Sequence, residues 1–95
     1  MSDEEKYREL IERMIKEERK VVKDVALKEV MEMDGIVIDD EGNVKELSED
    51  GCEIFRKIYS RYKELGFGTV KIIIKKAIDP VLENNPELEI PEELR

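Results

Sequence analysis

The first third of the chain carries apolar residues at the spacing of one face of a long helix. Between residues 3 and 34 they recur three or four positions apart, at Tyr7, Leu10, Ile11, Met14, Ile15, Val21, Val22, Val25, Ala26, Val30 and Met33. Ser2 or Asp3 can cap the start, and Gly35 suits the left-handed position after the last turn. The charged run KEERK at 16–20 interrupts the stripe, so either the helix bends there or its two halves serve different contacts.

A single helix over 3–34 would be long for so small a protein. It would measure about 46 Å, whereas a compact domain of this size has a radius of gyration of about 12–13 Å. Residues 1–15 are therefore a candidate for a helical arm that projects from the domain.

Two short runs of β-prone residues follow, Ile36–Ile38 and Val44–Leu47, on either side of DDEGN. Gly42 supplies the positive φ that a three- or four-residue hairpin loop needs. Because an isolated hairpin is marginally stable in water, we expect it to lie on the helices.

The second half of the chain predicts two more helices. Asp50 with Glu53 resembles a capping box, and Gly66 ends the helix; its apolar stripe comprises Ile54, Phe55, Ile58, Tyr59, Tyr62 and Leu65. The run from residue 69 to 76 fits a strand as well as a helix, and its continuation in phase to Ile78 favours a helix. Asp79–Pro80 then predicts a kink or a new helical turn.

The sequence thus predicts one mainly helical α+β domain over 1–95, with three helices and a small hairpin in the order α-β-β-α-α. Residues 84–95 form an acidic tail with two prolines, Pro86 and Pro91, either docked or mobile.

Composition narrows the class of protein. Charged residues make up 44% of the chain, Lys and Glu dominate, and His, Gln and Trp are absent. This is typical of proteins from heat-loving organisms, and also of a highly charged mesophilic or designed helical protein. No apolar run of membrane-spanning length and no secretory signal is found, and Cys52 has no second cysteine to pair with, so we expect a cytoplasmic protein without membrane contact.

The net charge of −8 is unevenly distributed. Residues 52–78 hold seven bases and two acids, a net charge of +5, between acidic flanks. The bases outside the apolar stripes are Arg56, Lys57, Arg61, Lys63, Lys71, Lys75 and Lys76. This basic segment predicts a site for an anion, nucleic acid or acidic partner. The alternatives are a solvated surface or an intramolecular match for the acidic hairpin and tail.

The corner LGFGTVKIIIKK at 65–76 offers a second anion hypothesis. Backbone N–H groups at Gly68 and Thr69 could receive an anion, with Lys71 and Lys75 nearby. The corner matches neither of the common glycine-rich phosphate loops. Alternatively, Phe67 packs into the junction, Gly68 forms a turn and Thr69 caps the next helix.

Catalysis, metals and cofactors have little support. Without histidine the usual triads and zinc sites are unavailable, and Cys52 has no base partner in the sequence. The loop DDEGN fails the EF-hand pattern because Gly42 falls at position 4 when counted from Asp39. We expect no enzyme.

The apolar stripe before KEERK is the remaining candidate for function. Its side chains, Tyr7, Leu10, Ile11, Met14 and Ile15, predict an interface with a partner, most simply a second copy of the chain. Alternatively, this half folds back onto the two later helices. The sequence therefore predicts a non-enzymatic protein–protein interaction or self-association module; the alternative is an anion or nucleic-acid binder that uses residues 52–78.

Overall fold

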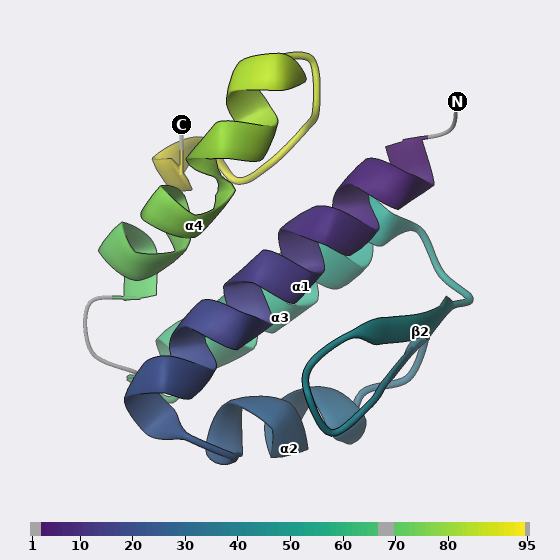
Figure 1. The fold of residues 1–95 in the computed structure, drawn as a ribbon, viewed down its shortest axis with the longest axis vertical. Helices are drawn as coiled ribbons and strands as arrows, with labels where there is room; N and C mark the ends of the chain where they lie inside the picture. Colours follow the sequence, from purple (N-terminus) through teal and green to yellow (C-terminus); the bar gives the residue numbers. More distant parts are fainter. Residues whose placement is uncertain (1–2, 67–69, 95) are drawn as a thin grey trace.

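The fold was examined in a computed structural model, which describes residues 3–66 and 70–94. Its elements are α1 (Asp3–Val22), α2 (Val25–Met31), β1 (Ile36–Ile38), β2 (Val44–Leu47), α3 (Gly51–Glu64), α4 (Val70–Asn84) and a short 3₁₀ turn, η1 (Glu92–Leu94). Helix α1 crosses the middle of the molecule, with α2 and the hairpin beyond one side and α4 beyond the other (Figure 1). The predicted mainly helical class with one antiparallel hairpin is confirmed.

The long first helix is divided in two, which corrects the prediction of one helix over 3–34. Helix α1 continues through KEERK and ends at Val22, and α2 begins at Val25. Lys23 between them has a φ of +61°, the left-handed conformation, which cannot continue a right-handed helix. The bend therefore falls a few residues after the charged run, at a position with no glycine to mark it.

Compactness explains the division. The Cα atoms span 31 × 27 × 19 Å with a radius of gyration of 12.0 Å, so a straight helix of about 46 Å would leave the domain. The turn at Lys23 brings Ala26, Leu27 and Val30 of α2 into the same core as α1. Helix α1 likewise packs along α3 and α4, so residues 3–15 do not project.

The hairpin has the two strands that the sequence predicts, with an irregular register between Val37 and Ile38. Its turn is organised by Asp39, whose carboxylate accepts hydrogen bonds from the backbone amides of Glu41 and Asn43, each at 2.9 Å. These bonds, the Asn43 amide foremost, lower the pKa of Asp39 to about 2. The expected positive φ at Gly42 is confirmed at +87°.

Side chains of α1 hold the hairpin against the helices. A carboxylate oxygen of Glu12 accepts the backbone N–H of Val44 at 2.8 Å, and Lys16 donates to the side chain of Asn43 at 2.6 Å. Gly42 lies so close to Ile15 that an added Cβ would come within 3.1 Å of its Cγ2. The hairpin thus packs on the helices, as expected, because a two-stranded hairpin is only marginally stable on its own.

The two later helices follow the sequence closely, with two differences. The positive φ at Gly66 is confirmed at +67°, and residues 70–76 are helical. Asp50 occupies the N-cap position of α3, but its side chain makes no capping hydrogen bond, so the expected capping box does not form. Helix α4 continues through Pro80 to Asn84, so the new helical turn that Asp79–Pro80 predicted does not begin there.

The tail after α4 is docked through residue 94. Leu88, Ile90 and Leu94 are buried in the common core. The hydroxyl of Tyr7 donates to the backbone carbonyl of Glu89 and accepts from its N–H. The beginning of α1 and the end of the described chain therefore stabilise one another.

Candidate functional site

The five residues expected at an interface lie inside the domain. Tyr7 is 6% exposed and Leu10, Ile11, Met14 and Ile15 are fully buried, all in the core formed with α3 and α4. This is the fold-back arrangement that the sequence left open. A partner could reach these side chains only if α1 left the domain, so the interface has to be sought elsewhere.

The basic segment is neutralised in part by the chain's own acids. Lys57 pairs with Glu49, which follows the hairpin, at 3.0 Å. Arg61 pairs with Glu29 of α2 at 3.6 Å, and the Lys63 ammonium pairs with Glu93 in the tail. The intramolecular match to hairpin and tail, one of the sequence alternatives, is thus present for Lys57 and Lys63.

Other bases keep their charge available to solvent. Lys71 and Lys76 are exposed, and Lys75 is half-buried. None of these three lysines forms a salt bridge with a carboxylate of residues 3–66 or 70–94, and neither does Arg56. The bases of α3 and α4 therefore divide into a paired set and a set that can meet an external charge.

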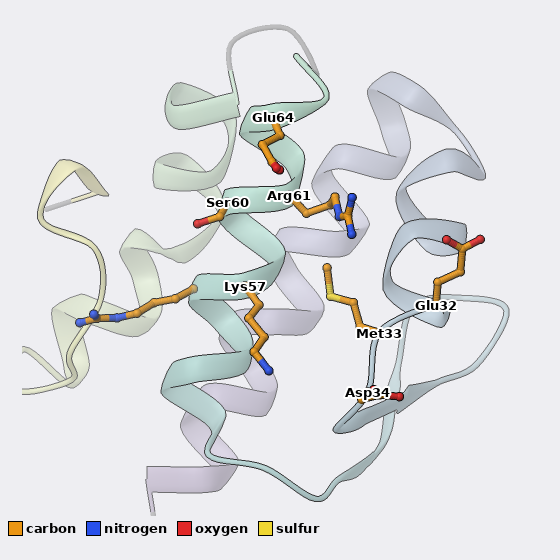
Figure 2. Close-up of a pocket in the computed structure, with 8 residues that line it drawn as sticks. Glu32, Met33, Asp34, Lys57, Ser60, Arg61 and Glu64 are labelled. Carbon is orange, nitrogen blue, oxygen red and sulfur yellow. The ribbon is translucent and has the colours of Figure 1, made fainter.

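A groove of about 530 Å³ lies between the end of α2 and α3, and we call it the α2–α3 groove. Figure 2 shows Lys57, Ser60, Arg61 and Glu64 along α3, with the Met33 side chain reaching toward that helix. Three acids and three bases line this groove: Glu32, Asp34, Glu64, Arg56, Lys57 and Arg61. Opposite charges at such proximity cancel, so the groove has no strong preference for anions.

The glycine corner can be followed only in part. Gly66 ends α3 and Val70 begins α4, whereas Phe67, Gly68 and Thr69 lie outside the described residues. The anion hypothesis for Gly68 and Thr69 therefore stays a prediction. Lys71 and Lys75, its two basic members, lie on the first turns of α4.

A second hollow, of about 400 Å³, lies where α3 and α4 approach the tail, and we call it the α3–α4 hollow. Tyr59, Val70 and Ile72 supply its apolar lining, and Lys63, Lys71 and Glu93 its charges. The Lys63 ammonium lies 5.2 Å from the centre of the Tyr59 ring, and its hydrogen bond lowers the pKa of the Glu93 carboxyl. The charged side chains of Lys63 and Glu93 are therefore held in position beside the apolar lining of the hollow.

Ile72 is the unusual residue of this hollow. Its side chain is 58% exposed, the largest value among the large hydrophobic side chains that the structure describes. No role for Ile72 was predicted from the sequence. The run of three isoleucines at 72–74 could have indicated it, because successive helical residues point about 100° apart and one of the three must leave the core.

Cys52 and the acidic residues are the remaining groups that could carry chemistry. The Cys52 thiol is half-buried and donates to the backbone carbonyl of Glu89 at 3.5 Å. Within residues 3–66 and 70–94, no group of three or more His, Cys, Asp or Glu side chains is placed to hold a metal ion. None of the helices described there has both the length and the apolar character needed to cross a bilayer.

Comparison with protein-family models, with curated proteins and with solved structures found no match. The function has to be argued from the geometry of this chain alone.

Proposed function

We propose that the protein is a non-enzymatic protein–protein interaction module, and that it binds a short segment of a partner protein in the α3–α4 hollow. The observation that carries the proposal is the exposure of Ile72 beside the apolar walls of Tyr59 and Val70. A single exposed hydrophobic side chain is common on protein surfaces, but an apolar hollow rimmed by charged residues is typical of an interaction site, and Ile72 belongs to such a hollow. Burying such a side chain contributes about 1.5–3 kcal/mol to binding.

The charges at the hollow favour a segment with one apolar side chain flanked by carboxylates. Lys71 is exposed and forms no salt bridge with the described carboxylates, and Lys63 already holds the carboxylate of Glu93. The pKa of Glu93 is lowered first by the hydrogen bond from Lys63 and, to a smaller extent, by the charge of Lys71. The chain's own tail is thus an example of the recognised chemistry. The net charge of −8 does not oppose this, because charges farther away than about 8 Å are screened at physiological salt.

A partner docked on the first helix has less support. Each of Leu10, Ile11, Met14 and Ile15 would lose its burial in the domain, at a cost of about 1.5–3 kcal/mol per side chain. A second copy of the chain could still occupy the α3–α4 hollow, and light scattering tests this because an assembly must have a multiple of 11.2 kDa.

The anion or nucleic-acid alternative is also less well supported. Two of its bases, Lys57 and Arg61, are paired within the chain, and the α2–α3 groove has as many acids as bases. Phosphate binding needs uncompensated positive charge, which this groove does not concentrate.

Composition supports the remaining parts of the proposal. The absence of histidine favours a non-enzymatic role, and the single unpaired Cys52 favours a cytoplasmic location. The high content of Lys and Glu favours a source that grows at high temperature.

The experiment is an NMR titration of the labelled protein with short synthetic peptides. One peptide has a leucine flanked by glutamates, and its control has the same leucine flanked by lysines. We expect the glutamate peptide to move the amide signals of Val70, Lys71 and Ile72 in a saturable way at 0.15 M salt. Ile72→Glu should abolish the shifts, whereas Val37→Glu should not, because Val37 is similarly exposed at 52% but belongs to the hairpin.

Three results would contradict the proposal. They are equal binding of the two peptides, no shift at α4 with either peptide, and shifts retained in Ile72→Glu. Inorganic phosphate that moves the signals of Lys57 and Arg61 would instead support the anion alternative.

A further inference from the structure

Glu18 is a carboxylate inside the core. Its side chain is 0% exposed, and neither of its carboxylate oxygens has a hydrogen bond with any residue that the structure describes. An ionised carboxylate in such a place is costly, so burial favours the neutral acid and raises the pKa of Glu18 to about 7. In the sequence Glu18 belongs to the charged run KEERK that interrupts the apolar stripe, and the fold nevertheless buries it completely.

The groups on the neighbouring helices do not neutralise this carboxylate. From α3, Tyr62 lies close to Glu18: burial first, and then the charge of Glu18, raise the pKa of the Tyr62 hydroxyl, which donates to the backbone carbonyl of Ala26 at 2.8 Å. From α2, the nearby charged group is another acid, Glu29, and it is already paired with Arg61. Ionisation would therefore place a second negative charge beside Tyr62.

Among residues 3–66 and 70–94, the remaining elements supply no counter-charge either. The bases next to Glu18 on α1 are engaged elsewhere, Arg19 with Asp24 at 3.8 Å and Lys20 with Glu17 at 3.0 Å. The buried residues of α4 are all apolar: Val70, Ile74, Ala77, Ile78 and Val81. The hairpin meets α1 through Glu12 and Lys16, which lie six and two residues before Glu18, and the Lys16 ammonium is bonded to the side chain of Asn43.

Helix α2 is the element whose movement would expose Glu18 with the least disruption. It has seven residues, against 14 to 20 in the other three helices that the structure describes. Helices this short are held by packing and not by their own hydrogen bonds. A left-handed residue lies just before it and another shortly after it, Lys23 at φ +61° and Gly35 at φ +90°. Its polar contacts with α3 include the hydrogen bond from the Tyr62 hydroxyl to Ala26 and the partly exposed salt bridge between Glu29 and Arg61.

We propose that Glu18 couples its charge to the docking of α2: the neutral acid lies in the closed core, and its ionisation releases α2 between the left-handed residues Lys23 and Gly35 so that water reaches the carboxylate. Opening would bare Ala26, Leu27 and Val30, an apolar strip that is buried in the closed form. The protein thereby contains a pH-sensitive conformational device that is separate from the α3–α4 hollow.

The direction of the effect follows from the two pKa values. In the open form the carboxylate titrates near its usual 4.5, and in the closed form near 7. The closed form is fully favoured below pH 4.5 and loses that advantage as the pH rises through 7. The ratio of open to closed molecules should rise about tenfold per pH unit between these values, about 300-fold in all, and then level off.

Native-state hydrogen exchange of the full chain tests the proposal, with rates expressed as protection factors so that the intrinsic pH dependence of exchange is removed. We expect the amides of Lys28 and Val30 in α2 to lose protection between pH 4.5 and 7, while that of Ile58 in α3 keeps it. Glu18→Gln, an uncharged replacement of the same shape, should leave α2 protection independent of pH. Glu18→Met provides a second uncharged variant in case the glutamine destabilises the core.

Each alternative result overturns the proposal. Constant protection of α2 in the wild type would mean that Glu18 does not control docking. Equal loss in α2 and α3 would mean that the whole domain opens. The same pH dependence in wild type and in both variants would assign the effect to another group.

Discussion

The hydroxyl of Tyr7 donates to the carbonyl oxygen of Glu89 at 2.8 Å and accepts from the N–H of the same residue at 2.9 Å. One side chain in the second turn of α1 thus satisfies both backbone groups of a residue in the tail. The contact joins positions 82 residues apart, and the tail that it holds contributes the buried side chains of Leu88, Ile90 and Leu94.

Removing this hydroxyl should loosen the tail. Tyr7→Phe leaves the ring in place but deprives the N–H and C=O of Glu89 of their partner, so we expect a loss of about 1–3 kcal/mol in the free energy of unfolding. The Glu89 amide should also exchange faster with solvent. The Val44 amide, which is bonded to Glu12, is the internal control. Unchanged exchange at Glu89 would mean that the tail is held by other contacts.

Lys23→Gly tests the division of the first helix, because the variant should raise the free energy of unfolding if the helix is divided and lower it if the helix is continuous. At φ +61° glycine relieves a strain of about 1–2 kcal/mol that lysine bears, so the variant should be stabilised by up to about 1 kcal/mol after the entropy of the unfolded chain is included. Lys20→Gly, inside α1, should be destabilised by about 1 kcal/mol. Denaturant unfolding measures both, and destabilisation by Lys23→Gly would indicate a continuous helix.

Gly66 isolates the effect of backbone conformation. Its φ is +67° and an added Cβ would meet nothing within 4 Å, so a substitution there costs conformational strain without a steric clash. We expect Gly66→Ala to destabilise by about 1 kcal/mol and Gly66→Asn by less, because asparagine tolerates the left-handed region. Equal melting curves for the wild type and the alanine variant would contradict this end of α3.

Glu12 should govern the attachment of the hairpin. Glu12→Ala leaves the Val44 amide without its acceptor, so we expect a loss of about 1–3 kcal/mol and faster exchange at Val44. Glu9→Ala removes a carboxylate one turn earlier whose salt bridge with Arg13 is solvent-exposed, and it should change stability by less than about 1 kcal/mol. Similar effects of the two variants would show that the bond to Val44 contributes little.

The elements that could be predicted from sequence are those fixed by local chemistry. Gly42 and Gly66 marked their turns because positive φ selects glycine, and both strands kept their expected bounds. The turn at Lys23 could not be predicted, because lysine has no preference for that conformation. It is imposed by the packing of Ala26 and Val30 into a core that long-range contacts define.

The candidate site was harder to predict from the sequence than the fold. A stripe such as Leu10 to Ile15 has the same spacing whether it meets a partner or the chain's own helices, so its periodicity could not identify its neighbour. Salt bridges such as Arg61–Glu29 and Lys63–Glu93 join residues about 30 positions apart and follow only from the tertiary fold. The burial of Glu18 could not be predicted for the same reason, since it follows from the tertiary packing that brings Tyr62 of α3 close to it.

The packing of α1 against α4 and the tail has a consequence for the order of events during synthesis. Helix α1 is made first, yet its apolar face is covered by α4, and Tyr7 is bonded only when Glu89 has been made. Chains grow at about 5–20 residues per second, so for several seconds the nascent helix presents an uncovered apolar stripe to the cell. Folding of this domain is therefore expected to be completed only after Glu89 has left the ribosome, and until then the uncovered stripe of α1 can bind chaperones.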